Sequence, residues 1–391
     1  MIKSFSFSRI PEIYFGTGKL EVLPEKIKYF GKNILLVTGK SSFIKSSGGN
    51  RILNKLSEEK INFEMVQSIG EPSVKFIDEV CEKYKNHSFN VVVSIGGGSV
   101  IDAGKAISAM LTIKKPVAGF LEGNSSGKIH PGTKIPFIAV PTTAGTGSEA
   151  TKNAVLSDTG ENGFKLSLRH DNFVPDIAII DPELTLQCPP NISAASGLDA
   201  FTQLFEAYTS SKATSLSDAI ALEGMKKVID SLTIAFINGS DIDARSDMSY
   251  AALLSGIALV NAGLGAIHGF ASSIGGLFDI PHGVICGTLL GVVNRKNIQK
   301  VLKFESSNEI FLKYSGIGQL FTKETRKPGI FYIQKLALEI DQWIEELKIP
   351  RLGEFGIKKE HIDKIITKTG IKNNPVPLSK EELADILRER I

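Results

Sequence analysis

Four polar side chains in the second half of the chain have types and positions that suit a metal site. Asp199 and Gln203 are four residues apart, so they share one face of a helix. His268 and His282 follow in apolar, glycine-rich segments of a chain that has only six histidines. Either histidine alone would more often be a core residue with a hydrogen-bond partner. Together with the carboxylate they indicate one divalent metal ion, because buried imidazoles and carboxylates are costly unless paired or metal-bound.

A glycine-rich turn in the first half has the context that an anion-binding site requires. Gly96, Gly97, Gly98 and Ser99 follow a strand-like apolar run and precede a predicted helix. Backbone N–H groups at a helix start carry partial positive charge, and glycine leaves room for a pyrophosphate. A plain tight turn would need only one or two glycines, so we interpret this one as phosphate-binding. It matches neither the G-x-G-x-x-G fingerprint nor a P-loop.

A second polar turn, Pro141–Glu149, follows another strand-like run and is rich in threonine and glycine. Small hydroxyl residues at the carboxyl end of a strand suit hydrogen bonds to a ligand in the crevice of an open α/β sheet. The two turns together predict one crevice lined by backbone and hydroxyl donors.

Alternating strand and helix patterns must position these residues. Apolar runs rich in valine and isoleucine predict parallel strands buried on both faces at 33–39, 90–96, 137–140 and 177–180. Helical spacing predicts helices at 74–84, 100–111, 194–208, 216–232, 250–260, 333–347 and 380–390. Residues 1–185 are therefore expected to form a doubly wound α/β domain, and residues 186–391 a helical domain. Residues 1–9 alternate in the manner of an edge strand.

Composition excludes several classes of protein. The formal charge of 45 − 42 = +3 is too balanced to indicate a nucleic-acid partner. Three widely separated cysteines favour a reducing, cytoplasmic compartment over a disulfide framework. Residues 248–278 contain no Asp, Glu, Lys or Arg and are long enough to span a membrane. His268 and several glycines and serines interrupt this stretch, so we expect buried helices and no membrane partner.

Taken together, these motifs resemble the iron-containing (group III) alcohol dehydrogenase family. The matching segments are Phe15–Gly18, Gly96–Ser99 with Asp102 and Lys105, Pro141–Glu149, Asp181–Pro182, Gly197–Ala200, His268, Pro281–Gly283 and Asn374–Pro375. They run in the family's order across nearly the whole chain. The resemblance implies a dehydroquinate synthase-like architecture, with the active site between an α/β dinucleotide-binding domain and an all-α domain. It also implies a metal-dependent NAD(P)(H) oxidoreductase that interconverts an alcohol and an aldehyde or ketone.

The family's site residues carry over by position. The resemblance implies that the cofactor contacts Gly97, Gly98, Ser99, Asp102, Thr142, Thr143, Thr146 and Lys165. It implies metal ligands at Asp199, His268 and His282, where the ion acts as a Lewis acid during hydride transfer.

Two positions depart from the family pattern. Gln203 stands where the fourth ligand is usually histidine, and Ser272 stands where a histidine usually relays a proton. An amide oxygen suits ferrous iron less than imidazole does, and the related glycerol dehydrogenases hold zinc on an Asp/His/His set. We therefore expect iron or zinc, with Gln203 as a fourth ligand or holding a bound water.

The residue that selects between NAD and NADP commonly follows the first strand of the dinucleotide-binding domain. In this chain Gly39 occupies that place, followed by Lys40, Ser41 and Ser42. An acidic residue there would repel the 2′-phosphate of NADP, whereas glycine leaves room and lysine can donate to it. We therefore expect NADP(H) to be preferred over NAD(H), although Gly39 could be a turn residue only.

Two other functions stay open at this point. Dehydroquinate synthase relatives share the architecture and use NAD transiently, so a lyase or cyclase is one alternative. The replaced histidine positions also allow a non-catalytic, ligand-binding descendant. The family suggests a homodimer or a higher homo-oligomer with a small alcohol or carbonyl substrate.

Overall fold

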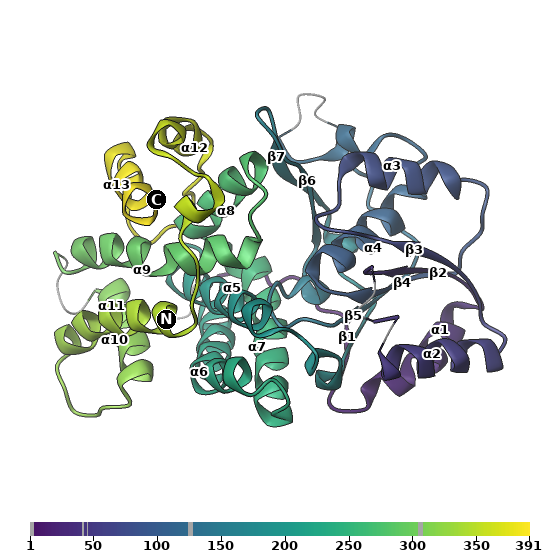
Figure 1. Ribbon diagram of the computed structural model, residues 1–391, viewed down its shortest axis with the longest axis horizontal. Coiled ribbons are helices and arrows are strands. Elements are labelled where there is room, and N and C mark those ends of the chain that lie inside the picture. The colour runs from purple at the N-terminus through teal and green to yellow at the C-terminus, as the bar shows by residue number, and fades with distance from the viewer. Residues whose placement is uncertain (1–3, 41–42, 45, 124–127, 304–307) are drawn as a thin grey trace.

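A six-stranded parallel sheet forms the first half of the chain in the computed structural model (Figure 1), which describes residues 4–40, 43–44, 46–123, 128–303 and 308–391. The strands are β1 (Glu12–Phe15), β2 (Asn33–Thr38), β3 (Asn62–Gln67), β4 (Val91–Gly96), β5 (Phe137–Pro141) and β8 (Ile177–Ile180), in the spatial order β1-β8-β5-β4-β2-β3. The chain runs outward from β2 to β3 and returns on the other side of β2 as β4. The carboxyl ends of β2 and β4 therefore flank a switch point, where open α/β sheets bind ligands.

Helices cover both faces of this sheet. α1 (Leu23–Phe30) and α2 (Ser47–Glu58) lie on one side, and α3 (Val74–Lys83) and α4 (Gly98–Met110) lie on the other (Figure 1). Successive residues of a strand point to opposite faces, so Leu36 packs in the core beneath α1 and α2 while Leu35 packs in the core beneath α3 and α4. The predicted doubly wound domain, its four strands and its two helices are confirmed.

Two parts of the α/β half differ from the sequence analysis. Residues 4–9 form no strand, and the edge strand β1 begins three residues later, where it pairs with β8. The predicted strand at residues 1–9 is therefore wrong for residues 4–9, because alternation alone does not supply a partner strand, and residues 1–3 lie outside the described residues. An antiparallel hairpin of β6 (Asn153–Asp158) and β7 (Phe164–Arg169) was not predicted at all.

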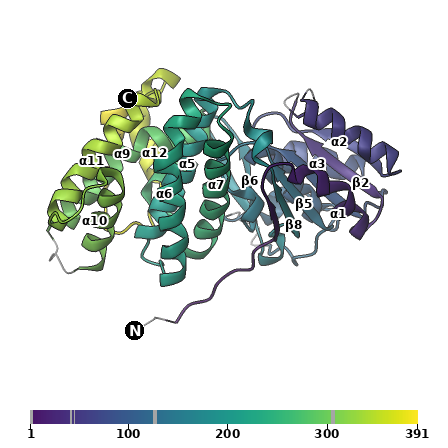
Figure 2. The same cartoon turned by 90° about the horizontal axis from the view of Figure 1, so that it is seen from below.

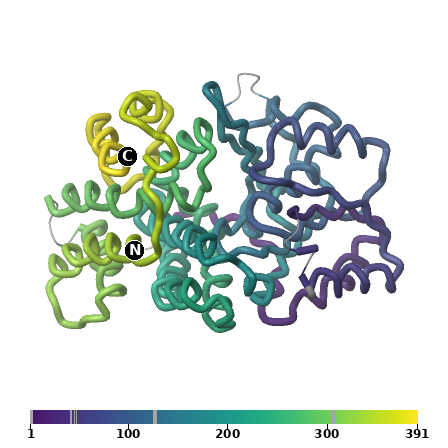
Figure 3. Tube along the Cα trace, in the orientation of Figure 1, coloured from purple at the N-terminus to yellow at the C-terminus, as the bar shows by residue number. Residues whose placement is uncertain are grey.

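The second half of the described chain is helical. Its helices are α5 (Pro190–Thr209), α6 (Ser215–Ile237), α7 (Ile242–Ala262), α8 (Ala266–Leu277), α9 (His282–Val301), α10 (Glu309–Thr322), α11 (Gly329–Glu346), α12 (Ile362–Lys368) and α13 (Lys380–Arg390). Figure 3 shows that the two halves follow one another along the chain, and Figure 2 shows α7 beside the sheet half. The sheet ends at Ile180 and α5 begins at Pro190, and the boundary at residue 185 stays a prediction.

Residues 248–278 fold into α7 and α8, which bend by 99° at a short break. No single helix in the described part of the chain is long and apolar enough to cross a membrane, and only this bent pair meets the criterion by length and composition. Residues 248–278 are largely buried in these two helices, as the lack of charge in this stretch predicts.

Candidate active site

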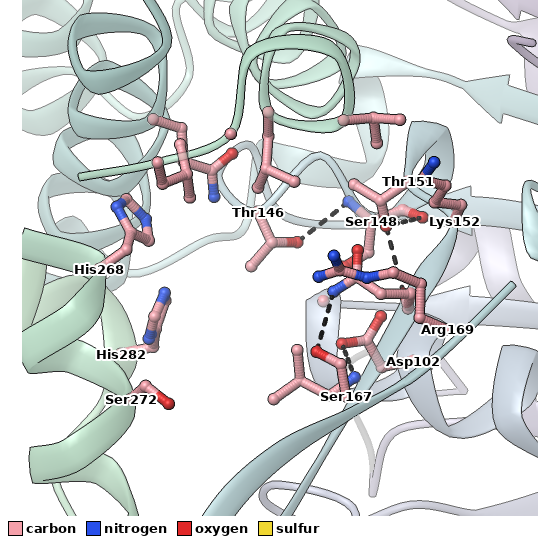
Figure 4. Close-up of a pocket in the computed structure, with 18 of the residues that line it drawn as sticks. Asp102, Thr146, Ser148, Thr151, Lys152, Ser167, Arg169, His268, Ser272 and His282 are labelled. Carbon is pink, nitrogen blue, oxygen red and sulfur yellow. Dashed lines mark hydrogen bonds between the residues drawn. The ribbon is translucent and has the colours of Figure 1, made fainter. Parts of the chain in front are cut away.

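A cleft of about 550 Å³ lies between the two halves and collects most of the predicted site residues. The α/β half contributes Gly98, Ser99, Asp102, Thr146 and Lys165, and the helical half contributes Gln203, His268, Ser272 and His282. In Figure 4 the two histidines and Ser272 face Asp102 and Thr146 across the opening. The volume is in the range of small-molecule and cofactor sites.

Three helices bring the predicted metal ligands together. Asp199 projects from α5, His268 from the first turn of α8, and His282 is the first residue of α9. Asp199 Oδ1 lies 3.4 Å from His268 Nε2 and 3.6 Å from His282 Nε2. This oxygen is buried and has no hydrogen-bond partner among the described residues, which is costly unless a cation compensates it. The donor set therefore fits a divalent metal.

Glu206 orients one of these ligands, and the sequence analysis missed it. Its carboxylate accepts a hydrogen bond from the His268 ring at Nδ1 (2.7 Å) and from the backbone N–H of Ile267 (2.7 Å) at the start of α8. A carboxylate on Nδ1 leaves the Nε2 lone pair free for a metal. Glu206 follows Asp199 by seven residues on α5, so its position on the same helical face was a signal that could have found it.

Cys286 is a second residue that the sequence analysis missed. It lies one turn after His282 on α9, and its Sγ is 3.7 Å from the Nε2 atoms of both His268 and His282. Single donor atoms of Asp199, His268, His282 and Cys286 all lie within 4.8 Å of one another. The i, i+4 spacing from His282 was visible in the sequence, but a lone cysteine gave no reason to use it.

Burial and neighbouring charges set the protonation of this cluster. Burial lowers the pKa of His282 to about 4, so its ring is neutral at pH 7 and can accept a metal. Burial alone would lower the pKa of His268, but Cys286, Asp199 and Glu206 raise it well above the ordinary value. Burial would raise the pKa of Asp199, yet the two imidazoles lower it on balance. A metal ion must therefore displace a proton from this buried cluster.

The two departures from the family pattern both lie on the cleft. Gln203 lines it, and Ser255 Oγ lies 3.0 Å from Gln203 Oε1, although the Ala252 carbonyl (2.8 Å) and the Gly145 carbonyl (3.3 Å) compete for the same proton. Ser272 Oγ lines it too, and donates to the backbone carbonyl of Lys165 (3.1 Å). The predicted role of Gln203 as a ligand or a water holder stays a prediction.

The glycine-rich turn opens α4 as predicted, with Gly97 at the N-cap and no side-chain cap. A Cβ on Gly98 would lie 2.5 Å from Thr146 Oγ1. Glycine is therefore needed at 98 because the two polar turns touch there, which is a packing reason and not room for a pyrophosphate. What favours an anion is the set of free N–H groups at the start of α4.

Lys105 ties the second turn to α4. Its buried ammonium donates to Ser148 O (2.8 Å), Thr151 Oγ1 (2.9 Å) and Asn153 O (2.8 Å), and lies 3.7 Å from Asp102. Asp102 in turn accepts from the Val155 N–H at Oδ2 (3.0 Å), while Oδ1 faces the ammonium at 3.7 Å without a hydrogen-bond partner among the described residues.

A glycine pair sets the second turn against the helical half. Gly147 has φ +62°, and a Cβ there would lie 2.4 Å from the backbone of Gly256 on α7. The two halves therefore meet backbone to backbone beside the cleft.

Some predicted residues do not line the cleft itself. Asp199 lies behind the histidines, and Gly97, Thr142 and Thr143 lie in the two turns just outside the lining. Gly39 follows β2 at the switch point, and the carbonyl of the exposed Lys40 accepts from Gln67 Nε2 (3.3 Å). Ser41 and Ser42 are outside the described residues.

Comparison with known proteins agrees with this geometry. A family profile described as "Iron-containing alcohol dehydrogenase" matches residues 11–182, and one described as "Fe-containing alcohol dehydrogenase family, C-terminal" matches residues 193–391. The chain belongs to the iron-containing alcohol dehydrogenase family. It is therefore a metal-dependent oxidoreductase that acts on a small alcohol or aldehyde with a nicotinamide cofactor. The lyase or cyclase alternative and the non-catalytic one are not favoured.

Members of the iron-containing alcohol dehydrogenase family match over the full chain. "Alcohol dehydrogenase 4" of Saccharomyces cerevisiae is 33% identical, with 97% of each chain covered. "NAD-dependent methanol dehydrogenase" of Bacillus methanolicus is 28% identical, covering 97% of this chain and 98% of the relative. The crystal structure of a 1,3-propanediol oxidoreductase superposes with a TM-score of 0.88 at 28% identity, with 100% of both chains covered. These matches confirm the predicted family and the dehydroquinate synthase-like architecture.

Proposed function

We propose that one divalent metal binds to Asp199, His268 and His282 on one wall of the cleft, opposite a nicotinamide cofactor that binds along the two polar turns. The observation that carries this proposal is the convergence of three ligands from three helices, with a buried and unpartnered Asp199 oxygen among them. When bound, the metal polarises the substrate oxygen as a Lewis acid. Glu206 holds the His268 ring so that Nε2 faces the site.

The cofactor is proposed to lie on the wall of the α/β half. The N–H groups at the start of α4, with Gly97, Gly98 and Ser99, suit the pyrophosphate. Asp102 Oδ1 has no hydrogen-bond partner among the described residues and can accept a hydrogen bond from a hydroxyl or an amide of the ligand. Further along this wall we propose contacts from Thr142, Thr143, Thr146 and Lys165. Lys165 is held near the site by an ion pair with Glu71 (3.3 Å).

A proton must leave the alcohol on oxidation or reach the carbonyl on reduction. Ser272 Oγ lies on the cleft next to the histidines and is the hydroxyl at the place where the family usually relays a proton. It can pass a proton only after its hydrogen bond to the Lys165 carbonyl is released. We propose that Ser272 orders a water for this purpose, because a serine does not titrate near neutral pH.

We propose a preference for NADP(H) over NAD(H). Support comes from Gly39, which has no side chain to oppose a 2′-phosphate, and from the exposed Lys40 beside it. The Bacillus methanolicus relative is named for NAD, so the family does not fix the choice. The measurement is the ratio of kcat/KM for NADPH and NADH with one aldehyde, in the wild type and in Gly39→Asp. A wild type that prefers NADH, or a ratio that Gly39→Asp leaves unchanged, would rule the preference out.

A cytoplasmic homodimer or higher homo-oligomer is also proposed. Cys81, Cys188 and Cys286 are all free thiols, which supports a reducing compartment. The oligomeric proposal rests on the family likeness, and light scattering of the purified protein tests it.

The main test is metal content measured together with turnover. His282→Ala should lower the metal-to-protein ratio and NAD(P)H oxidation in the same proportion. His87→Ala is the matched control, because His87 is exposed and lies outside the cleft lining, so metal content and turnover should both stay unchanged. Full metal occupancy in His282→Ala would remove His282 from the site.

A further inference from the structure

We propose that the thiolate of Cys286 is the fourth metal ligand, in the place that Gln203 leaves without an imidazole. This inference rests on the proposed function, since it concerns the same metal site. It adds a ligand that the family pattern does not contain, and it changes the metal that the site prefers.

The first argument is distance. Metal bonds of about 2.0–2.2 Å to nitrogen or oxygen and about 2.3 Å to sulfur place tetrahedral donor atoms about 3.4–3.6 Å apart. Asp199 Oδ1 lies 3.4 and 3.6 Å from the two histidine Nε2 atoms. Cys286 Sγ lies 3.7 Å from each of the same nitrogens. These four distances are close to those of a tetrahedral shell, and all four donor atoms lie within 4.8 Å of one another.

The second argument is the chemistry of the interior. Cys286 is fully buried and Asp199 is 1% exposed, so water does not compete for either group. Asp199 Oδ1 has no hydrogen-bond partner among the described residues and belongs to the same cluster. A buried carboxylate oxygen without a partner points to a cation at the point where the thiol also converges.

The third argument concerns Gln203, the other candidate for the fourth position. Its amide oxygen lies 3.0 Å from the hydroxyl of Ser255, which also lies 2.8 Å from the Ala252 carbonyl and 3.3 Å from the Gly145 carbonyl, so three acceptors share one proton. The sulfur of Cys286 faces the Nε2 atoms of both histidine ligands. A thiolate is also a far stronger ligand for zinc than a neutral amide oxygen.

Binding in this mode is a proton exchange at the sulfur. The S–H bond breaks, a sulfur–metal bond forms, and the proton leaves to solvent, so the charge of the site falls by one relative to an Asp/His/His set. An Asp/His/His/Cys set is a zinc-type site, because thiolate and imidazole together favour zinc. The substrate oxygen would then enter as a fifth ligand, which zinc accepts in catalysis.

The test uses cobalt(II) as the probe metal in the full-length protein, after the native metal has been removed with a chelator. Thiolate bound to cobalt(II) gives an intense near-ultraviolet charge-transfer band that nitrogen and oxygen ligands do not give. We expect this band in the wild type, and we expect Cys286→Ser to lose it while still binding cobalt. Cys81→Ser and Cys188→Ser are matched controls that should keep the band, as should Gln203→Ala.

A measurement on the wild type alone covers the case in which Cys286→Ser fails to fold. X-ray absorption of the zinc form should show one sulfur neighbour at about 2.3 Å. Competition between zinc and ferrous iron gives a third readout. The ratio of zinc to iron affinity should fall at least about tenfold in Cys286→Ser.

The outcomes separate this inference from the proposed function. Cobalt bound without the charge-transfer band, together with zinc lacking a sulfur neighbour, would overturn the role of Cys286 and leave the Asp/His/His site standing. A wild type that binds neither metal would overturn both.

Discussion

Lys105→Met should destabilise the protein by about 3–5 kcal/mol, the cost of breaking a buried ion pair from one side. Burial lowers the pKa of Lys105 to about 8, so the group is charged at pH 7. Its ammonium makes three hydrogen bonds to the chain around the second polar turn, each worth about 1.5–3 kcal/mol. The cost of burying the ammonium offsets much of that sum. Methionine keeps the packing of the side chain, so the loss is electrostatic and includes an uncompensated Asp102.

Urea unfolding at pH 7 measures this loss. Circular dichroism follows both halves, while fluorescence of Trp343, the only tryptophan, follows the helical half. The double variant Lys105→Met with Asp102→Leu should recover at least about 1 kcal/mol, because it removes the buried charge left behind. A loss below about 1 kcal/mol in the single variant, or no recovery in the double variant, would refute the assignment of Lys105 as the anchor of the turn.

Three further outcomes follow from the site. Glu206→Gln should weaken metal binding about 10–100-fold, because the His268 ring is no longer held in place. Competition with a chelator measures the metal affinity, and an affinity equal to that of the wild type would contradict the orienting role. Gly98→Ala should lower cofactor affinity and stability together, by about 1–3 kcal/mol, because the new Cβ meets Thr146. Adding Thr146→Ala to this variant should restore part of both. A loss of affinity without a loss of stability would argue against a clash between residues 98 and 146. Burial raises the pKa of Glu149 to about 7. As pH rises from 4.5 to 7, the wild type should therefore lose up to about 3 kcal/mol of stability relative to Glu149→Gln. A difference in unfolding free energy between the two proteins that stays constant across this pH range would contradict the prediction.

The parts of the fold that could be predicted are those with a local signal. Residues 91–96 form a strand buried on both faces, and a continuous apolar run reports that directly. The β6–β7 hairpin has no such run, and only one of the six residues of β7, Leu168, is buried, so its pattern was too weak to recognise. Residues 4–9 show the opposite error, since their alternating pattern predicted a strand but no partner strand lies beside them.

The residues of the site also divide into those with a local sequence signal and those without one. The Asp and His ligands stand out because the segments around them carry few charges and the chain has only six histidines. Whether the amide oxygen of Gln203 has a neighbouring hydroxyl depends on Ser255, which lies 52 residues further along the chain. Helical spacing carries no information on that contact. The contact of Cys286 with His282 lies within α9, but its contact with His268 depends on how α8 packs against α9, which the sequence pattern does not report.

Because the ligands come from three separate helices, metal binding should affect how stable the protein is and how fast it is degraded. An ion held between α5, α8 and α9 acts as a cross-link that closes long loops of the unfolded chain, and its binding energy adds to the folding of that half alone. The sheet half contributes no ligand to the cluster of buried donors and gains nothing directly. Metal starvation should therefore expose the helical half to proteolysis first, and the cellular amount of intact enzyme would follow the supply of its metal.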